Sequence, residues 1–102
     1  MTNRLESLER MAERSPSDPR AHFGLAAEYE RAGRWSDVVA TLERYLELAD
    51  DEGNAWGRLG RALRELGRDD LARAAYRRGI EAANAHGHPS MAAEFEETLE
   101  GW

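Results

Sequence analysis

The chain has 102 residues, which suffices for one compact domain with a single modest core and excludes a multidomain enzyme. Its 14 basic and 20 acidic residues give a net charge of −6, which opposes binding to duplex nucleic acid or to an anionic membrane. Cysteine is absent, so disulfides, zinc–thiolate sites and thiol catalysis are excluded. No apolar run is long enough to span a membrane, and residues 1–10 lack the features of a signal peptide, so we expect a cytoplasmic protein.

Apolar residues recur every three or four positions along most of the chain, and no stretch alternates with the period of two that is typical of strands. This pattern predicts an all-α protein of about six helices in a single domain, 1–102. Proline occurs only at breaks in the helical pattern. In chain order the predicted elements are an N-terminal helix at 3–16, helix pairs at 19–52 and 53–86, and a C-terminal helix at 89–100.

Several residues are suited to begin or end these helices. Asp18 stands before a proline and is expected to be the N-cap of the helix that follows. We expect Ser36 and Asp70 to cap the second helix of each pair. Gly33 and Gly67 are expected to end the first helix of each pair in the left-handed conformation.

The two helix pairs are copies of one unit with a period of 34 residues. A shift by this period superimposes Gly33 on Gly67 and Leu25 on Leu59, so the turns and the apolar positions coincide together. A repeat of two helices around a glycine turn is therefore predicted.

The repeat resembles the tetratricopeptide repeat, whose pattern is W-x2-L-G-x2-Y followed by A-x3-F. In the second pair the matching residues are Trp56, Leu59, Gly60, Ala72 and Tyr76. The first pair matches more loosely, with His22 at the Trp position. The resemblance implies a right-handed α–α superhelix in which 3–16 and 89–100 are capping half-repeats, and a non-enzymatic module that binds proteins.

No constellation of residues predicts catalysis, a cofactor or a metal. His22 is distant in sequence from His86 and His88, which have no third ligand at metal spacing, so we expect ordinary surface histidines. The serines flank helix starts, where capping explains them. We therefore predict no catalytic, cofactor-binding or metal-binding residue; a small enzyme that uses His86 or His88 is the third alternative.

Tetratricopeptide arrays bind an extended peptide or helix along a concave groove formed by their first helices, and the resemblance implies the same here. The residues expected to point into this groove are Arg20, Phe23, Ala27, Arg31, Asn54, Arg58, Arg61 and Arg64. Three of these arginines are spaced by three residues and form a basic stripe, beside which Gly24, Ala27 and Gly57 are expected to leave room. Because guanidinium groups bind carboxylates in a planar fork, the expected ligand is an acidic segment or a free C-terminus.

Two other interpretations remain open. Glu94 and Glu97, on the solvated face of the C-terminal helix, could pair with Arg58 and Arg61 inside the folded chain. Alternatively, that acidic helix could meet the basic stripe of a second copy and form a homodimer, aided by Trp102. Trp102 either packs on the last helix or stays available to a partner.

Overall fold

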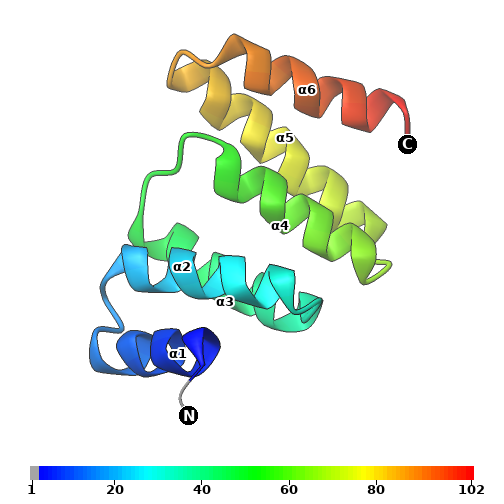
Figure 1. Cartoon of the computed structure of the whole chain (residues 1–102). Coiled ribbons are helices and arrows are strands. Elements are labelled where there is room, and N and C mark those ends of the chain that lie inside the picture. Colours follow the sequence, from blue (N-terminus) through cyan, green and yellow to red (C-terminus); the bar gives the residue numbers. More distant parts are fainter. Residues whose placement is uncertain (1–2) are drawn as a thin grey trace. The chain divides into compact units, whose positions relative to one another are not determined.

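A computed structural model describes residues 3–102. Those residues form six helices and no strand, which confirms the prediction of an all-α helical-repeat fold. The helices are α1 (Arg4–Arg14), α2 (Pro19–Arg31), α3 (Trp35–Leu48), α4 (Asn54–Glu65), α5 (Asp69–Ala85) and α6 (Pro89–Glu100) (Figure 1). They belong to two compact units: unit 1 ends at Ala49 and unit 2 is Asp50–Trp102.

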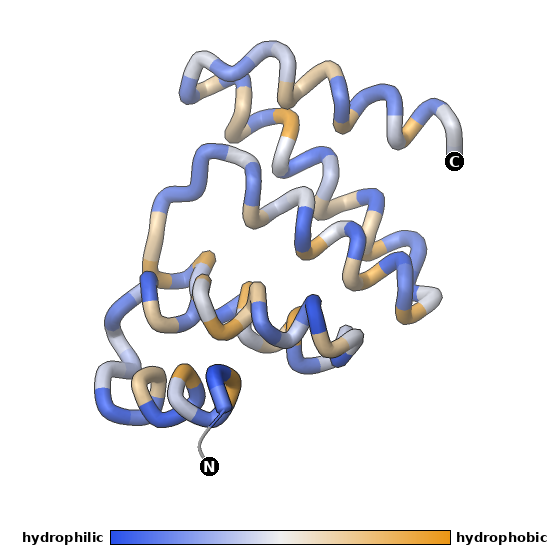
Figure 2. Tube along the Cα trace, in the orientation of Figure 1, coloured by the Kyte–Doolittle hydropathy of each residue, from blue (hydrophilic) through white to orange (hydrophobic). Residues whose placement is uncertain are grey.

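In unit 1, α2 packs against both α1 and α3. Val38 and Leu42 of α3 are completely buried, and Leu25 and Ala26 of α2 are buried as well. The Tyr29 hydroxyl of α2 donates a hydrogen bond of 2.8 Å to the carboxylate of Glu9 in α1. Hydrophobic and hydrophilic residues alternate along each helix in Figure 2, as expected for amphipathic helices that bury one face.

In unit 2, α5 packs against both α4 and α6. Two glycines of α4 make this packing close. A Cβ at Gly60 would lie 2.8 Å from the ring of Tyr76, and a Cβ at Gly57 would lie 2.6 Å from the ring of Phe95. These aromatic rings therefore occupy the space that larger residues in α4 would need.

The first and second helices of each pair are joined by the same turn. Gly33 and Gly67 have φ angles of 70° and 74°, which confirms the predicted left-handed conformation. The amide of the residue after each glycine then donates to a carbonyl in the last turn of the preceding helix: Arg34 to Tyr29 and Arg68 to Leu63. This hydrogen bond satisfies a carbonyl that the helix end leaves without a helical partner.

The predicted caps of the second helices are wrong. α3 and α5 begin two residues earlier than expected, so Arg34 and Arg68 are the N-cap residues, and Ser36 and Asp70 lie in the first turn. The glycine turn is the cause, because it leaves only one residue before the next helix starts. By contrast, Asp18 is the N-cap of α2 as predicted, and its carboxylate accepts a hydrogen bond of 2.9 Å from the Arg20 amide.

The start of α4 is fixed by a buried carboxylate that sequence reasoning missed. Asp51 is buried, and its Oδ2 accepts hydrogen bonds from the amides of Gly53 at 2.8 Å and Ala55 at 2.9 Å. Gly53 has a φ of 125°, and a Cβ there would lie 2.9 Å from the Met91 sulfur of α6. Glycine is therefore required at this position by both conformation and space.

Candidate functional site

The residues predicted to bind a partner lie on the first helix of each pair. Arg20, Phe23, Ala27 and Arg31 lie on α2, and Asn54, Arg58, Arg61 and Arg64 lie on α4. Within each set the spacing is three or four residues, so each set lies along one side of its helix. The two sets belong to different units.

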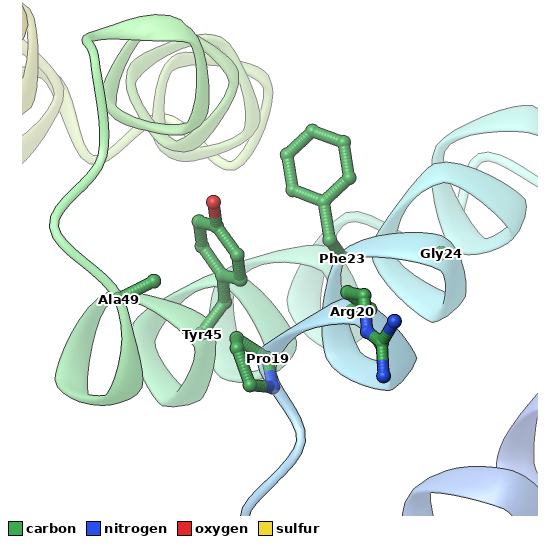
Figure 3. Close-up of a pocket in the computed structure, with 6 residues that line it drawn as sticks. All are labelled: Pro19, Arg20, Phe23, Gly24, Tyr45 and Ala49. Carbon is green, nitrogen blue, oxygen red and sulfur yellow. The ribbon is translucent and has the colours of Figure 1, made fainter.

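The α2 residues border an apolar depression of about 330 Å³. Its lining residues are Pro19, Arg20, Phe23, Gly24, Tyr45 and Ala49 (Figure 3). The rings of Phe23 and Tyr45 lie side by side, with centroids 5.0 Å apart and planes tilted by 53°. Sequence reasoning identified Arg20 and Phe23 but missed Tyr45, because Tyr45 comes from α3 and no local pattern pairs it with Phe23.

Arg20, at the edge of this depression, makes an ion pair with the helix cap. Its Nε lies 3.2 Å from the Asp18 carboxylate, yet its side chain is 91% exposed. The hydrogen bonds from the side chain and the amide of Arg20 lower the pKa of Asp18, and the same pairing raises the pKa of Arg20. Solvent screens an ion pair this exposed, so Arg20 can exchange Asp18 for another carboxylate.

Arg31, at the other end of the α2 set, is held within unit 1. Its Nη1 donates to Glu28 Oε1 at 2.7 Å, and the same oxygen accepts a hydrogen bond of 2.7 Å from Arg4 Nε. Glu28 therefore links α1 to the end of α2 through two guanidinium groups. Arg31 is thus a structural residue as well as a predicted binding residue.

On α4, Arg61 and Arg64 are exposed and Arg58 is half-buried. Both exposed arginines act on Tyr76 of α5. Burial raises the pKa of Tyr76, and the positive charges of Arg64 and Arg61 oppose this rise.

One expectation about this region needs correction, and one open alternative is decided. Gly57 does not leave room beside the stripe, because the Phe95 ring fills the space next to it. Of the two alternatives for Trp102, packing is what the structure shows. Its ring lies edge-on to Tyr76 at a centroid distance of 6.0 Å, and the guanidinium of Arg64 lies 4.1 Å from its centroid.

Of the three histidines expected to be ordinary surface residues, only His22 differs, since His86 is exposed and His88 is half-buried. His22 is buried, and its Nε2 lies 2.8 Å from the Pro16 carbonyl oxygen. His86 lies 3.3 Å from the Asp50 carboxylate and His88 lies 3.1 Å from the Glu52 carboxylate. Across residues 3–102, no group of three or more potential ligands is arranged to hold a metal ion. In the same part of the chain, no helix is both long and apolar enough to cross a membrane.

Two successive helix pairs, each joined internally by the same type of glycine turn, define a helical-repeat protein. Residues 19–62, which span α2, α3 and most of α4, match the family model described as tetratricopeptide repeat. The match to residues 19–62 supports a tetratricopeptide repeat protein. A search of curated proteins found no match. Repeats of this family generally mediate protein–protein interaction, and the family is typically a non-enzymatic scaffold.

Proposed function

We propose that this chain is a non-enzymatic, cytoplasmic interaction module that binds a peptide or partner segment carrying carboxylates. The exposed sides of α2 and α4 are the proposed binding surfaces, with the eight residues predicted from the sequence. The proposal keeps the division into repeats at 19–52 and 53–86, with capping helices at 3–16 and 89–100.

The observation that carries this proposal is the depression beside Phe23 and Tyr45. Two aromatic rings provide an apolar surface for one side chain, and the exposed Arg20 guanidinium stands at the edge. Apolar pockets with a few oriented polar groups are the usual form of specific binding sites. An apolar residue next to a carboxylate is the ligand that suits this combination.

The basic stripe on α4 supports the same class of ligand. Arg58, Arg61 and Arg64 share one helix face, in a protein whose net charge is −6. An acidic segment would be repelled by most of the molecular surface and attracted to this face. The stripe would thus favour binding in one place and one orientation.

Selection from a peptide library with free and amidated C-termini tests the proposal. We expect acidic peptides with an apolar residue to be enriched, and their affinity to fall steeply with salt, since the Debye length shortens from about 10 Å at 0.1 M to about 3 Å at 1 M. F23A should weaken binding, and the double variant R58E/R61E should abolish it. The matched control R68E/R77E makes the same charge change at two exposed arginines outside the predicted surface.

The outcome that contradicts the proposal is equally specific. If enriched peptides bound R58E/R61E, F23A and the control with the same affinity and without salt dependence, these surfaces would not be the binding site. If the wild type were instead a dimer in light scattering and R58E/R61E a monomer, self-association through the acidic face of α6 would replace peptide binding.

A further inference from the structure

We propose that Arg64 and Arg73, held by the Trp102 ring, form an anchoring site for a carboxylate, with Trp102 as the residue that positions both guanidinium groups. The inference rests on the proposed function, because Arg64 belongs to the predicted binding surface. It extends that function to Arg73, which the sequence did not assign to binding, and gives Trp102 the role of positioning both guanidinium groups.

Both guanidinium groups lie over one indole ring. The Cζ of Arg64 lies 4.1 Å from the centroid of the Trp102 ring, and the Cζ of Arg73 lies 4.8 Å from it. Arg64 comes from α4, Arg73 from α5 and Trp102 from the segment after α6. The ring therefore contacts two cations from two helices.

The contacts that fix Trp102 are made mainly by its ring and less by its backbone. It lies beyond the last residue of α6, and its amide makes a long hydrogen bond of 3.4 Å to the Leu99 carbonyl. Its ring packs edge-on against Tyr76, whose ring also contacts Phe95 at a centroid distance of 5.7 Å. This aromatic cluster orients the indole and, through it, the two arginines.

The cation–π contact does not use the hydrogen-bond donors of the guanidinium groups. The N–H groups of a guanidinium above an aromatic ring can therefore still bind a carboxylate in a fork. Within residues 3–102, Arg64 makes no ion pair. Arg73 has only a 3.5 Å contact with Asp70, whose side chain is fully exposed.

The local charge favours an anion. Two like charges on one ring repel each other, and Arg61 adds a third positive charge near Tyr76. Bound carboxylate would neutralise part of this repulsion. Because Trp102 restricts two long side chains before the ligand arrives, less conformational freedom is lost on binding.

Two small probes test the site in the full-length chain. Propionate represents an acidic side chain, and N-acetylglycine represents the free C-terminus of a peptide. The Nε–Hε signals of the arginines are followed by NMR during titration with each probe. We expect saturable shifts of the Arg64 and Arg73 signals, and the probe with the lower dissociation constant identifies which source of carboxylate the site prefers.

Variants of Trp102 test its positioning role, and variants of the two arginines test the role of their charge and shape. W102A should raise the dissociation constant by about fivefold or more, and W102F should have a smaller effect, because indole is the strongest cation-binding ring. R64Q should abolish saturable binding, and R73K should weaken it since lysine keeps the charge but lacks the planar fork. R77Q removes an exposed arginine from the same helix as Arg73 and should have no effect.

The inference is overturned if W102A and R73K, with unchanged circular dichroism spectra, bind both probes as the wild type does. It is also overturned if the Arg77 signal shifts with the same concentration dependence as the Arg64 signal, since binding would then be non-specific. The titration needs no partner protein. A positive titration together with failed peptide selection would therefore reject the proposed function and leave this site in place.

Discussion

Glycines inside helices control how closely the helices of unit 2 approach one another. Gly60 lies against the Tyr76 ring, and Gly57 and Gly79 both lie against the Phe95 ring. Gly24 in α2 is different, because a Cβ there would lie at an ordinary contact distance of 3.5 Å from Leu8. The same residue type therefore serves packing in unit 2 and has no such requirement at position 24.

The first prediction compares two of these glycines. G60A should destabilise the protein by about 1–3 kcal/mol, because the new Cβ overlaps a buried ring and α4 must move away from α5. G24A should stabilise it by about 0.5–1 kcal/mol, since alanine is the better helix former. Denaturant unfolding followed by circular dichroism measures both; equal effects of the two substitutions would contradict the assigned packing.

The second prediction concerns alkaline pH. Tyr29 is buried, and burial together with its hydrogen bond to Glu9 raises its pKa to about 12. The unfolded chain releases this proton near pH 10, so the folded state favours the neutral phenol. The resulting stabilisation is fully present below pH 10 and is lost as pH rises toward 12.

Urea unfolding at a series of pH values from about 9 to 12 measures this loss. Y29F removes the titrating group, so its stability should fall less over the same interval. Tyr76, whose pKa is also raised, adds a loss of the same sign in both proteins. Identical pH profiles for Y29F and the wild type would show that Tyr29 ionisation is not the cause.

At the scale of the elements, the two helices of each pair are joined by a turn of the same conformation. The turn after α2 and the turn after α4 share a glycine at positive φ and the same hydrogen bond back to the preceding helix. A Cβ at Gly33 or Gly67 would meet nothing within 4 Å, so the backbone conformation alone selects glycine there.

The third prediction tests, at position 67 alone, whether the backbone conformation is what requires glycine. G67V should cost about 1–2 kcal/mol, because a β-branched residue is strained at positive φ. G67N should cost less, since asparagine tolerates the left-handed conformation. Because a Cβ at this position meets nothing within 4 Å, a difference in the melting temperatures of the two variants reports conformation; equal melting temperatures would contradict the turn assignment.

The fourth prediction concerns α6 as the C-terminal cap of unit 2. Deletion of residues 89–102 removes the Phe95 ring that lies against Gly57 and Gly79 and the Met91 side chain that lies against Gly53. We expect the truncated chain to aggregate or to lose cooperative unfolding, because a helical array depends on contacts between neighbouring helices. F95A tests the same contact in the full-length chain and should cost roughly 3 kcal/mol. An unchanged melting temperature in both variants would contradict the capping role.

At the scale of the whole molecule, opposite charges are concentrated in different elements. The α6 helix contains Glu94, Glu96, Glu97 and Glu100, all exposed, whereas α4 contains three arginines and one glutamate. Such a distribution can guide an acidic partner to α4, join two copies of the chain, or stabilise the folded chain itself.

The fifth prediction distinguishes these roles. If Arg58 and Arg61 bind a partner, R58E/R61E should abolish capture and leave the melting temperature nearly unchanged. If they pair with Glu94 and Glu97, the same double variant should melt at a lower temperature, and the added reversals E94R/E97R should restore it. Light scattering of each variant reports self-association, which should be absent in the wild type if peptide binding is the function.

Local features of the sequence determined the helices and the turns of this protein. Helical periodicity, proline at the breaks and glycine at positive φ act over three or four residues, so they can be identified without knowing what lies nearby in space. Even so, the caps at Ser36 and Asp70 were predicted wrongly, since the glycine turn places Arg34 and Arg68 at those positions. The residues predicted on α2 share one side of that helix, because such a side follows directly from the spacing.

Contacts between residues distant in sequence were decided only by the tertiary structure. Tyr45 reaches Phe23, Phe95 fills the space at Gly57, and Trp102 lies against Arg64 from α4. Each contact depends on which side chains the packed helices bring together, and a period of three or four residues carries no information about residues of another helix. The sequence by itself therefore predicted the repeat and the side of each helix, whereas packing determined the depression beside Phe23 and the position of Trp102.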